Sequence, residues 1–269
     1  MSPQESKTAP FTLGPSLASA DFAVLLLHGF TGSPWEVRPL GESLAARRAH
    51  VFCPRLPGHG STPEAMLYAD HRDWLRAASD ALEQVQGARK VVLAGLSMGA
   101  LLAMILAGRR TRRVDALVLL APVLRFHQRE ARLLRALRFL PVFDVAPKWV
   151  QKSGTDIELD EVRAESPVIM RYPLARAFDL MALQDLAKAA EPRITCPSLV
   201  VGAAHDHVVD TDAALALADR LPFSKKVLLQ RGFHIIPRDT DRALAFTEIH
   251  HFLDTVVGAS DAVAARGRG

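Results

Sequence analysis

The sequence is poor in cysteine and has no long apolar run. Its only cysteines among 269 residues are Cys53 and Cys196, which excludes a disulfide framework and favours a reducing compartment with two free thiols. Apolar runs such as 22–27, 91–94 and 116–121 fall far short of the roughly 18 residues that a membrane-spanning helix needs. The first residues also lack the basic start and apolar centre of a secretory signal. We therefore expect a cytoplasmic protein.

Strong charge of one sign is missing too. Lys and Arg number 33 and Asp and Glu number 29, which leaves a formal net charge of +4 at pH 7. A nucleic-acid-binding protein usually carries a denser basic patch, so we expect no nucleic-acid partner. With 49% hydrophobic residues, the chain can bury a large core, and this excludes a disordered or fibrous protein.

Short apolar segments of strand length alternate with helical segments along the chain. Strands are expected within 22–29, 50–54, 91–94, 115–122, 197–206 and 225–234, and helices over 35–48, 71–86, 100–107, 212–220 and 243–257. A short edge strand is also expected in the first twenty residues. Nearly continuous apolar strands are typical of sheets covered on both faces, and the alternation implies crossover connections. We predict an α/β protein with a mostly parallel central sheet flanked by helices.

Residues 123–190 break this alternation, because they contain several prolines, many Arg and Leu, and no strand-like run. We interpret them as a helical cap inserted into a core formed by residues 1–122 and 191–257. Residues 258–269 are expected to be a disordered tail.

The first half of this insertion is amphipathic. In a helical projection one side carries Leu133, Leu134, Leu137 and Leu140, and the other carries Arg129, Arg132, Arg135 and Arg138. Two interpretations remain open. The helix packs on its own domain for stability, or its apolar face lines a substrate pocket or makes transient contact with a lipid surface.

The segment Gly95-Leu96-Ser97-Met98-Gly99 fits the pattern G-x-S-x-G between a predicted strand and a predicted helix. In that setting the serine stands on a sharp turn, the nucleophile elbow. Side chains two residues before and after the serine would collide there, and glycine avoids the collision. We take Ser97 as the candidate nucleophile rather than as part of an ordinary glycine-rich turn.

A serine nucleophile needs a general base, and position along the chain singles out His234. His234 directly follows the last predicted strand, so we expect it at the same edge of the sheet as Ser97. Asp206 ends the strand before it and would accept the Nδ1 hydrogen of His234. Asp210 and Asp212 are alternatives, but they are better placed to cap the next helix.

Two backbone N–H groups are candidates for an oxyanion hole. Met98 follows the nucleophile, and Phe30 lies in the loop after the strand at 22–27. We expect His28 and Gly29 to hold the shape of that loop. The two histidines beside Asp206 lack an evident third ligand, so we predict no metal.

These motifs resemble those of the bacterial serine carboxylesterases and monoacylglycerol lipases of the α/β-hydrolase superfamily. The resemblance rests on His28–Gly32, Leu56–Gly60, Gly95–Gly99, His205-Asp206 and His234. Together they cover residues 23–236. It implies an α/β-hydrolase fold, no cofactor, and a cap over the acyl pocket with Leu133, Leu134 and Leu137 as substrate-binding residues.

The sequence departs from these relatives at two positions. Phe233 stands before the histidine where a small residue is usual, and Ala100 stands where a second glycine often follows the elbow. Superfamily dehalogenases and epoxide hydrolases carry Asp in place of Ser97. Prolyl peptidases usually have a Gly-Gly-Pro oxyanion loop, which is absent here.

The expected function is hydrolysis of short- to medium-chain acyl esters, with monoacylglycerols as one possible substrate. A lysophospholipase or an acyl thioesterase would use the same three residues. A non-catalytic binding protein is a further alternative, and the intact Ser97, Asp206 and His234 argue against it. The partner is accordingly a small acyl ester or a monoacyl lipid.

Overall fold

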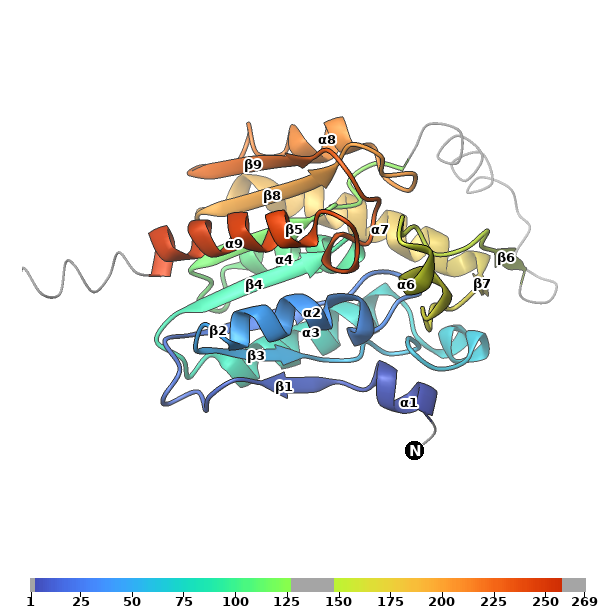
Figure 1. Cartoon of the computed structure of the whole chain (residues 1–269), viewed down its shortest axis with the longest axis horizontal. Helices are drawn as coiled ribbons and strands as arrows, with labels where there is room; N and C mark the ends of the chain where they lie inside the picture. Colours follow the sequence, from blue (N-terminus) through green and yellow to red (C-terminus); the bar gives the residue numbers. More distant parts are fainter. Residues whose placement is uncertain (1–2, 127–147, 258–269) are drawn as a thin grey trace, which may run out of the picture.

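A seven-stranded sheet forms the centre of the protein (Figure 1). The computed structural model describes residues 3–126 and 148–257. The strands are β1 (Phe11–Leu13), β2 (Phe22–Leu27), β3 (Ala49–Cys53), β4 (Val91–Leu96), β5 (Ala116–Leu120), β8 (Ser198–Ala203) and β9 (Ser224–Leu229), in the spatial order β1-β3-β2-β4-β5-β8-β9. Every neighbouring pair is parallel except β1 with β3. This confirms the predicted mostly parallel sheet, with the expected short edge strand.

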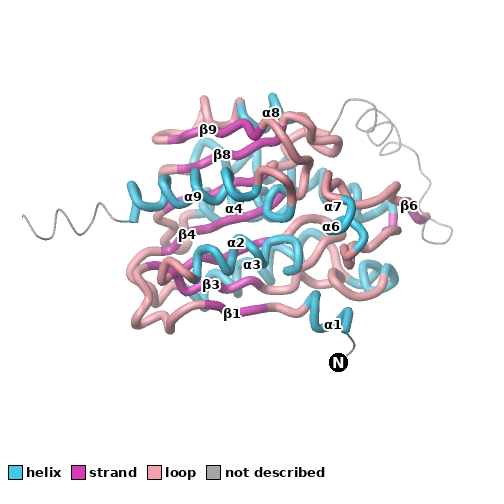
Figure 2. The backbone as a smooth tube through the Cα atoms, in the orientation of Figure 1, coloured by secondary structure: helices cyan, strands magenta, loops and turns pink. Residues whose placement is uncertain are grey.

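Helices cover both faces of the sheet (Figures 1 and 2). On one face lie α2 (Pro34–Ala45) and α9 (Arg242–Val257), and on the other lie α3 (His71–Val85), α4 (Met98–Arg109) and α7 (Leu174–Ala190). Shorter helices are α1 (Pro3–Thr8), α6 (Asp160–Ala164) and α8 (Thr211–Leu215), with 3-10 helices at Pro63–Tyr68, Glu191–Arg193 and Ile236–Arg238.

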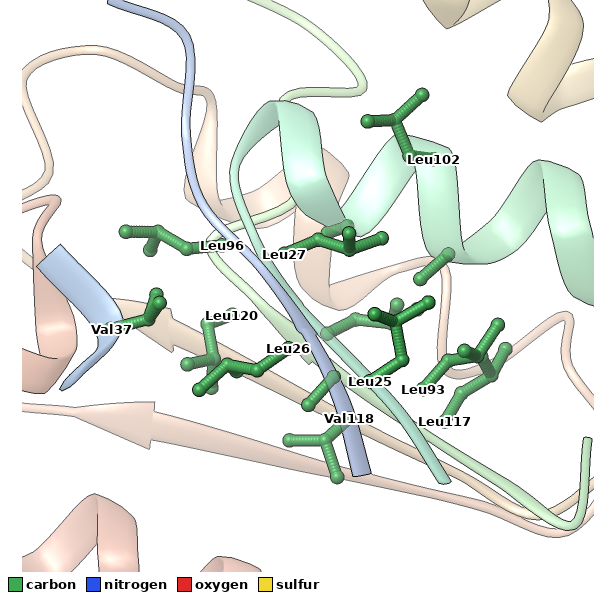
Figure 3. Close-up of a cluster of buried hydrophobic side chains, with 14 of the residues drawn as sticks. Leu25, Leu26, Leu27, Val37, Leu93, Leu96, Leu102, Leu117, Val118 and Leu120 are labelled. Carbon is green, nitrogen blue, oxygen red and sulfur yellow. The ribbon is translucent and has the colours of Figure 1, made fainter. Parts of the chain in front are cut away.

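The central strands β2, β4 and β5 are buried at every position. Alternate side chains point to opposite faces (Figure 3). Leu25, Leu27, Leu93 and Leu117 lie on the side of Leu102 in α4, and Leu26, Leu96 and Leu120 lie on the side of Val37 in α2. Burying such a side chain contributes about 1.5–3 kcal/mol. This double-sided burial explains why these segments are continuously apolar.

Local sequence also sets where the helices begin. Asp70 caps α3, because its carboxylate accepts hydrogen bonds from the backbone N–H groups of Arg72 and Asp73, and the Asp73 carboxylate accepts one from Asp70 N. Pro34 stands in the first turn of α2, where its missing N–H costs nothing.

The predicted insertion contains more than helices. Its described part holds a two-stranded antiparallel sheet of β6 (Trp149–Gln151) and β7 (Arg171–Pro173), along with α6 and α7. The expectation of no strand there was wrong, because three-residue strands are too short to show a period in the sequence. Figure 1 places β6, β7 and α6 beyond the carboxyl ends of the parallel strands.

Helix α8 is shorter than the predicted 212–220. After Leu215 the backbone continues in tight turns, in which Ala218 N donates to Leu215 O and Arg220 N donates to Leu217 O. The candidate substrate-binding residues Leu133, Leu134 and Leu137 and the predicted tail 258–269 lie outside the described residues.

Within residues 3–126 and 148–257, no helix has the length and apolar character that crossing a membrane requires. Cys53 and Cys196 are both free thiols, as predicted.

Core packing predicts a contrast between two leucines. Leu26 is fully buried and Leu244 is 48% exposed, so Leu26→Ala should lower the free energy of unfolding by about 2–5 kcal/mol. Leu244→Ala should change it by less than about 0.5 kcal/mol. Urea denaturation measures both, and equal losses in the two variants would contradict the assigned core.

Candidate active site

Ser97 stands on a strained turn between β4 and α4. Its backbone has φ +56° and ψ −112°, a region that residues with a Cβ rarely adopt. A Cβ on Gly99 would lie 2.2 Å from Leu27 O, and one on Gly95 would lie 2.3 Å from the carbonyl carbon of Gly99. The strand, turn and helix expected around Ser97 are therefore present, and both glycines are required by the close approach.

His234 and Asp206 meet at the carboxyl ends of the neighbouring strands β9 and β8. His234 Nδ1 lies 2.7 Å from Asp206 Oδ2, and both side chains are buried. The other carboxylate oxygen, Asp206 Oδ1, accepts hydrogen bonds from Val208 N at 2.8 Å and Val209 N at 2.9 Å. Asp210, the alternative acid, instead caps α8 by accepting from Ala213 N.

The buried pair has shifted pKa values. Burial alone would raise the pKa of Asp206, but the charge and hydrogen bond of His234 and the two backbone donors lower it below its usual range. Burial alone would lower the pKa of His234, but the charges of Asp206, Asp156 and Glu36, with the Asp206 hydrogen bond, raise it overall. The site therefore favours an ionised carboxylate beside a histidine that is more basic than usual.

The loop that carries Phe30 lies directly against Ser97. A Cβ on Gly29 would stand 3.6 Å from Ser97 Cβ. Thr31 adopts φ +60°, and its backbone oxygen accepts from Ile169 N at 3.0 Å. Its hydroxyl donates to Phe30 O at 2.6 Å. These bonds fix the peptide groups around Phe30, while Met98 begins α4 on the other side of Ser97.

Sequence reasoning missed two charged groups at this loop, the buried Glu36 and the half-buried Lys152. Glu36 Oε2 accepts from Gly29 N at 3.1 Å, and burial raises the pKa of Glu36. Lys152 Nζ donates to Thr31 Oγ1 at 2.8 Å, and burial lowers the pKa of Lys152. Glu36 looked like an ordinary first-turn acid of a helix, and no local pattern marked Lys152.

His28 holds two loops together and is not a base. Its Nε2 accepts from Leu56 N at 3.1 Å, and its Nδ1 donates to Gly29 O at 2.9 Å. Burial, with a smaller effect of the charge of His59, lowers the pKa of His28 to about 3. The ring is therefore neutral at physiological pH, as these two bonds require.

The two histidines beside Asp206 lie in different surroundings. His207 pairs with Asp156, and the Phe233 ring packs edge-on against the His207 ring at 4.6 Å. His205 is exposed. Phe233, the departure from related sequences, thus braces the loop that follows Asp206.

One cluster of possible metal ligands occurs among the residues that the structure describes. It consists of Asp70, His71 and Asp179. Arg176 Nε lies 2.9 Å from Asp179 Oδ2, so a guanidinium already supplies the positive charge there. The cluster ties α3 to α7.

Residues 18–241 match the Hydrolase_4 family, described as Serine aminopeptidase, S33. The chain belongs to this family. It is 28% identical over 252 residues to a carboxylesterase of Bacillus subtilis (strain 168), which covers 91% of this chain and 96% of the relative. It is 28% identical over 224 residues to a thermostable monoacylglycerol lipase of Bacillus sp. (strain H-257), covering 82% of this chain and 86% of that one.

A solved structure supports the assignment of this chain to the Hydrolase_4 family. A structure reported for LipS and LipT, two metagenome-derived lipolytic enzymes, superposes with a TM-score of 0.82 at 26% identity, over 93% of this chain and 98% of that one. The protein therefore has the α/β-hydrolase fold and is a hydrolase of the carboxylesterase and monoacylglycerol lipase type. This confirms the resemblance seen in the sequence.

The buried position of His28 predicts that its ring does not titrate near neutrality. Its NMR signals, identified with His28→Asn, should stay constant between about pH 5 and 8, because the charged ring would lose its bond from Leu56 N. In urea the same ring should titrate near the ordinary histidine pKa of about 6.5. A midpoint near 6.5 in the folded protein would rule out the buried neutral ring.

Proposed function

We propose that this Hydrolase_4 member hydrolyses short- to medium-chain carboxylic esters, monoacylglycerols among them, through an acyl-enzyme on Ser97. His234 is the general base and acid, and Asp206 orients it. The N–H groups of Phe30 and Met98 form the oxyanion hole. The proposal requires no cofactor.

The proposed reaction has two stages. Ser97 Oγ attacks the ester carbonyl carbon while His234 Nε2 takes the serine proton, and the resulting imidazolium is stabilised by Asp206. The two N–H groups stabilise the oxyanion of the tetrahedral intermediate. The carbon–oxygen bond to the alcohol then breaks, and the alcohol leaves with the proton from His234. Water attacks the acyl-enzyme by the same steps, which releases the acid and restores Ser97.

The observation that carries this proposal is the 2.7 Å contact of His234 Nδ1 with Asp206 at the edge of the sheet where the Ser97 elbow stands. Because Nδ1 is bound to the carboxylate, Nε2 is the ring nitrogen left for proton transfer. The strained elbow supports the same assignment, since backbone strain of this kind concentrates at functional sites.

The substrate class draws on the relatives. A carboxylesterase and a monoacylglycerol lipase match most of this chain, and this supports carboxylic esters, monoacylglycerols among them, as substrates. The family description names a peptidase, but the oxyanion turn here reads His28-Gly29-Phe30-Thr31 rather than the Gly-Gly-Pro loop usual in prolyl peptidases.

Replacing the nucleophile provides the first test. Ser97→Ala should keep the melting temperature within a few degrees and lower kcat for a p-nitrophenyl ester by about 10⁴–10⁶-fold, because no acyl-enzyme forms. Turnover that survives in a folded Ser97→Ala protein would exclude Ser97 as the nucleophile.

The raised pKa of His234 predicts the pH profile. His234 accepts the serine proton only when neutral, so kcat/KM should fall as the pH drops through its pKa. Since that pKa is raised, the midpoint of the fall should lie above the ordinary histidine value of about 6.5. Initial rates between about pH 4 and 9 give the midpoint, and a rate that rises toward acid would point to another base.

A substrate panel tests the class of ester. Ester kcat/KM should be highest within the short- to medium-chain range, measured with p-nitrophenyl esters and 1-monoacylglycerols from two to sixteen acyl carbons. Each buried CH₂ contributes about 0.8 kcal/mol, so a fitting pocket shows as a steep rise with chain length. Higher kcat/KM for lysophospholipids, acyl thioesters or peptide amides would replace this substrate class with one of those alternatives.

A further inference from the structure

One short segment of the insertion contacts the loops that carry the candidate catalytic groups. The segment runs from Lys152 to Glu158 and is named here the brace segment. Lys152 donates to Thr31 on the oxyanion loop. Asp156 binds the loops of Asp206 and His234, and Glu158 Oε2 accepts from Gly232 N at 3.1 Å.

Asp156 is the residue of the brace segment whose side chain bonds to His234. Its Oδ2 accepts from His207 N at 3.0 Å and from His234 N at 3.2 Å. Its Oδ1 lies 2.8 Å from His207 Nδ1, and its backbone oxygen accepts from Ile235 N at 3.1 Å. One carboxylate, 16% exposed, therefore joins the residue after Asp206 to His234 itself.

Asp156 constrains the backbone of His234, which Asp206 does not contact. Asp206 holds the imidazole ring, and Asp156 holds the backbone from which that ring projects. A displacement of about 1 Å in a catalytic group can cost on the order of 10²-fold in rate, so an anchor on the main chain of His234 bears directly on the reaction.

We propose that Asp156 is a positioning residue for hydrolysis, which fixes His234 against Asp206 and places a second negative charge beside the imidazolium. This proposal rests on the proposed function of Ser97 and His234. It assigns a part in that reaction to the predicted insertion. The family resemblance had implied only that this insertion forms a cap over the acyl pocket.

The charges around His234 set the sign of the effect. Asp206, Asp156 and Glu36 face His234 and raise its pKa against burial. Lys152 and Arg238 act on Glu36. Asp156→Asn removes one of the three negative charges, so the pKa of His234 should fall.

The two substitutions at Asp156 separate charge from hydrogen bonding. In Asp156→Asn the side-chain oxygen can still accept from His207 N and His234 N, and the amide NH₂ can donate to a neutral His207 Nδ1. Asp156→Ala removes both carboxylate oxygens, so the N–H groups of His207 and His234 lose this acceptor. Glu158→Gln is the matched control, because Glu158 lies in the same segment and binds Gly232 N and Thr240 Oγ1 but not His234.

The readout is inactivation by a neutral alkyl fluorophosphonate, with initial rates on a p-nitrophenyl ester alongside. In the inactivation Ser97 Oγ forms a bond to phosphorus, the phosphorus–fluorine bond breaks, fluoride leaves, and His234 takes the serine proton. The second-order rate constant is measured against pH for the full-length protein and each variant. Melting temperatures are recorded in parallel.

The expected results differ for each variant. Asp156→Asn should move the acidic limb of the rate profile to lower pH and stay within about threefold of the wild-type plateau. Asp156→Ala should lower the plateau by about tenfold or more, with kcat falling more than KM changes. Glu158→Gln should lower the melting temperature and leave the limb at its wild-type pH.

Two kinds of failure are distinguishable. If the wild-type protein is not labelled at Ser97, the proposed function fails. If it is labelled, but Asp156→Asn keeps the wild-type limb, or a folded Asp156→Ala keeps the wild-type plateau, the positioning role is overturned. A limb that shifts equally in Glu158→Gln also overturns it, because loosening of the segment alone would then explain the effect.

Discussion

The close approach of the elbow helix to strand β2 is the constraint on which the site depends. Gly99 lies so near the carbonyl oxygen of Leu27 that a Cβ would stand 2.2 Å from it. This contact sets α4 tightly against the sheet and places Ser97 at the strained turn. It also brings the loop after β2 against Ser97, so one packing contact positions both the candidate nucleophile and the candidate oxyanion donors.

Each charged group of the site is stabilised by partners from several elements and not by one partner alone. The carboxylates of Asp206, Asp156 and Glu36 act on His234, and Lys152 and Arg238 act on Glu36. A buried charge without such partners would cost several kcal/mol. These groups come from segments far apart in the sequence, and residues 152–158 bond directly to the loops of Thr31, His207 and His234. Residues 152–158 are therefore part of the site's framework.

The sequence predicts the parts of the fold that depend on local pattern. The continuous apolar strands, the G-x-S-x-G turn and the positions of Asp206 and His234 after successive strands are all readable from short segments. Asp156 and Lys152 were missed because their contacts join residues 78 and 121 positions apart, and nothing near them in sequence marks such pairs. Strands β6 and β7 were missed because a strand of three residues is too short to show the two-residue alternation of apolar and polar side chains.

The proposed acyl-enzyme on Ser97, formed with His234 as base, is tested most directly by trapping that intermediate. The protein is mixed with a p-nitrophenyl ester, quenched with acid after milliseconds, and analysed by intact mass and peptide mapping. We expect one acyl group per chain, on the peptide that contains Ser97, and its loss in His234→Ala. An acyl group on another residue, or unchanged acylation of Ser97 in His234→Ala, would exclude Ser97 as a nucleophile activated by His234.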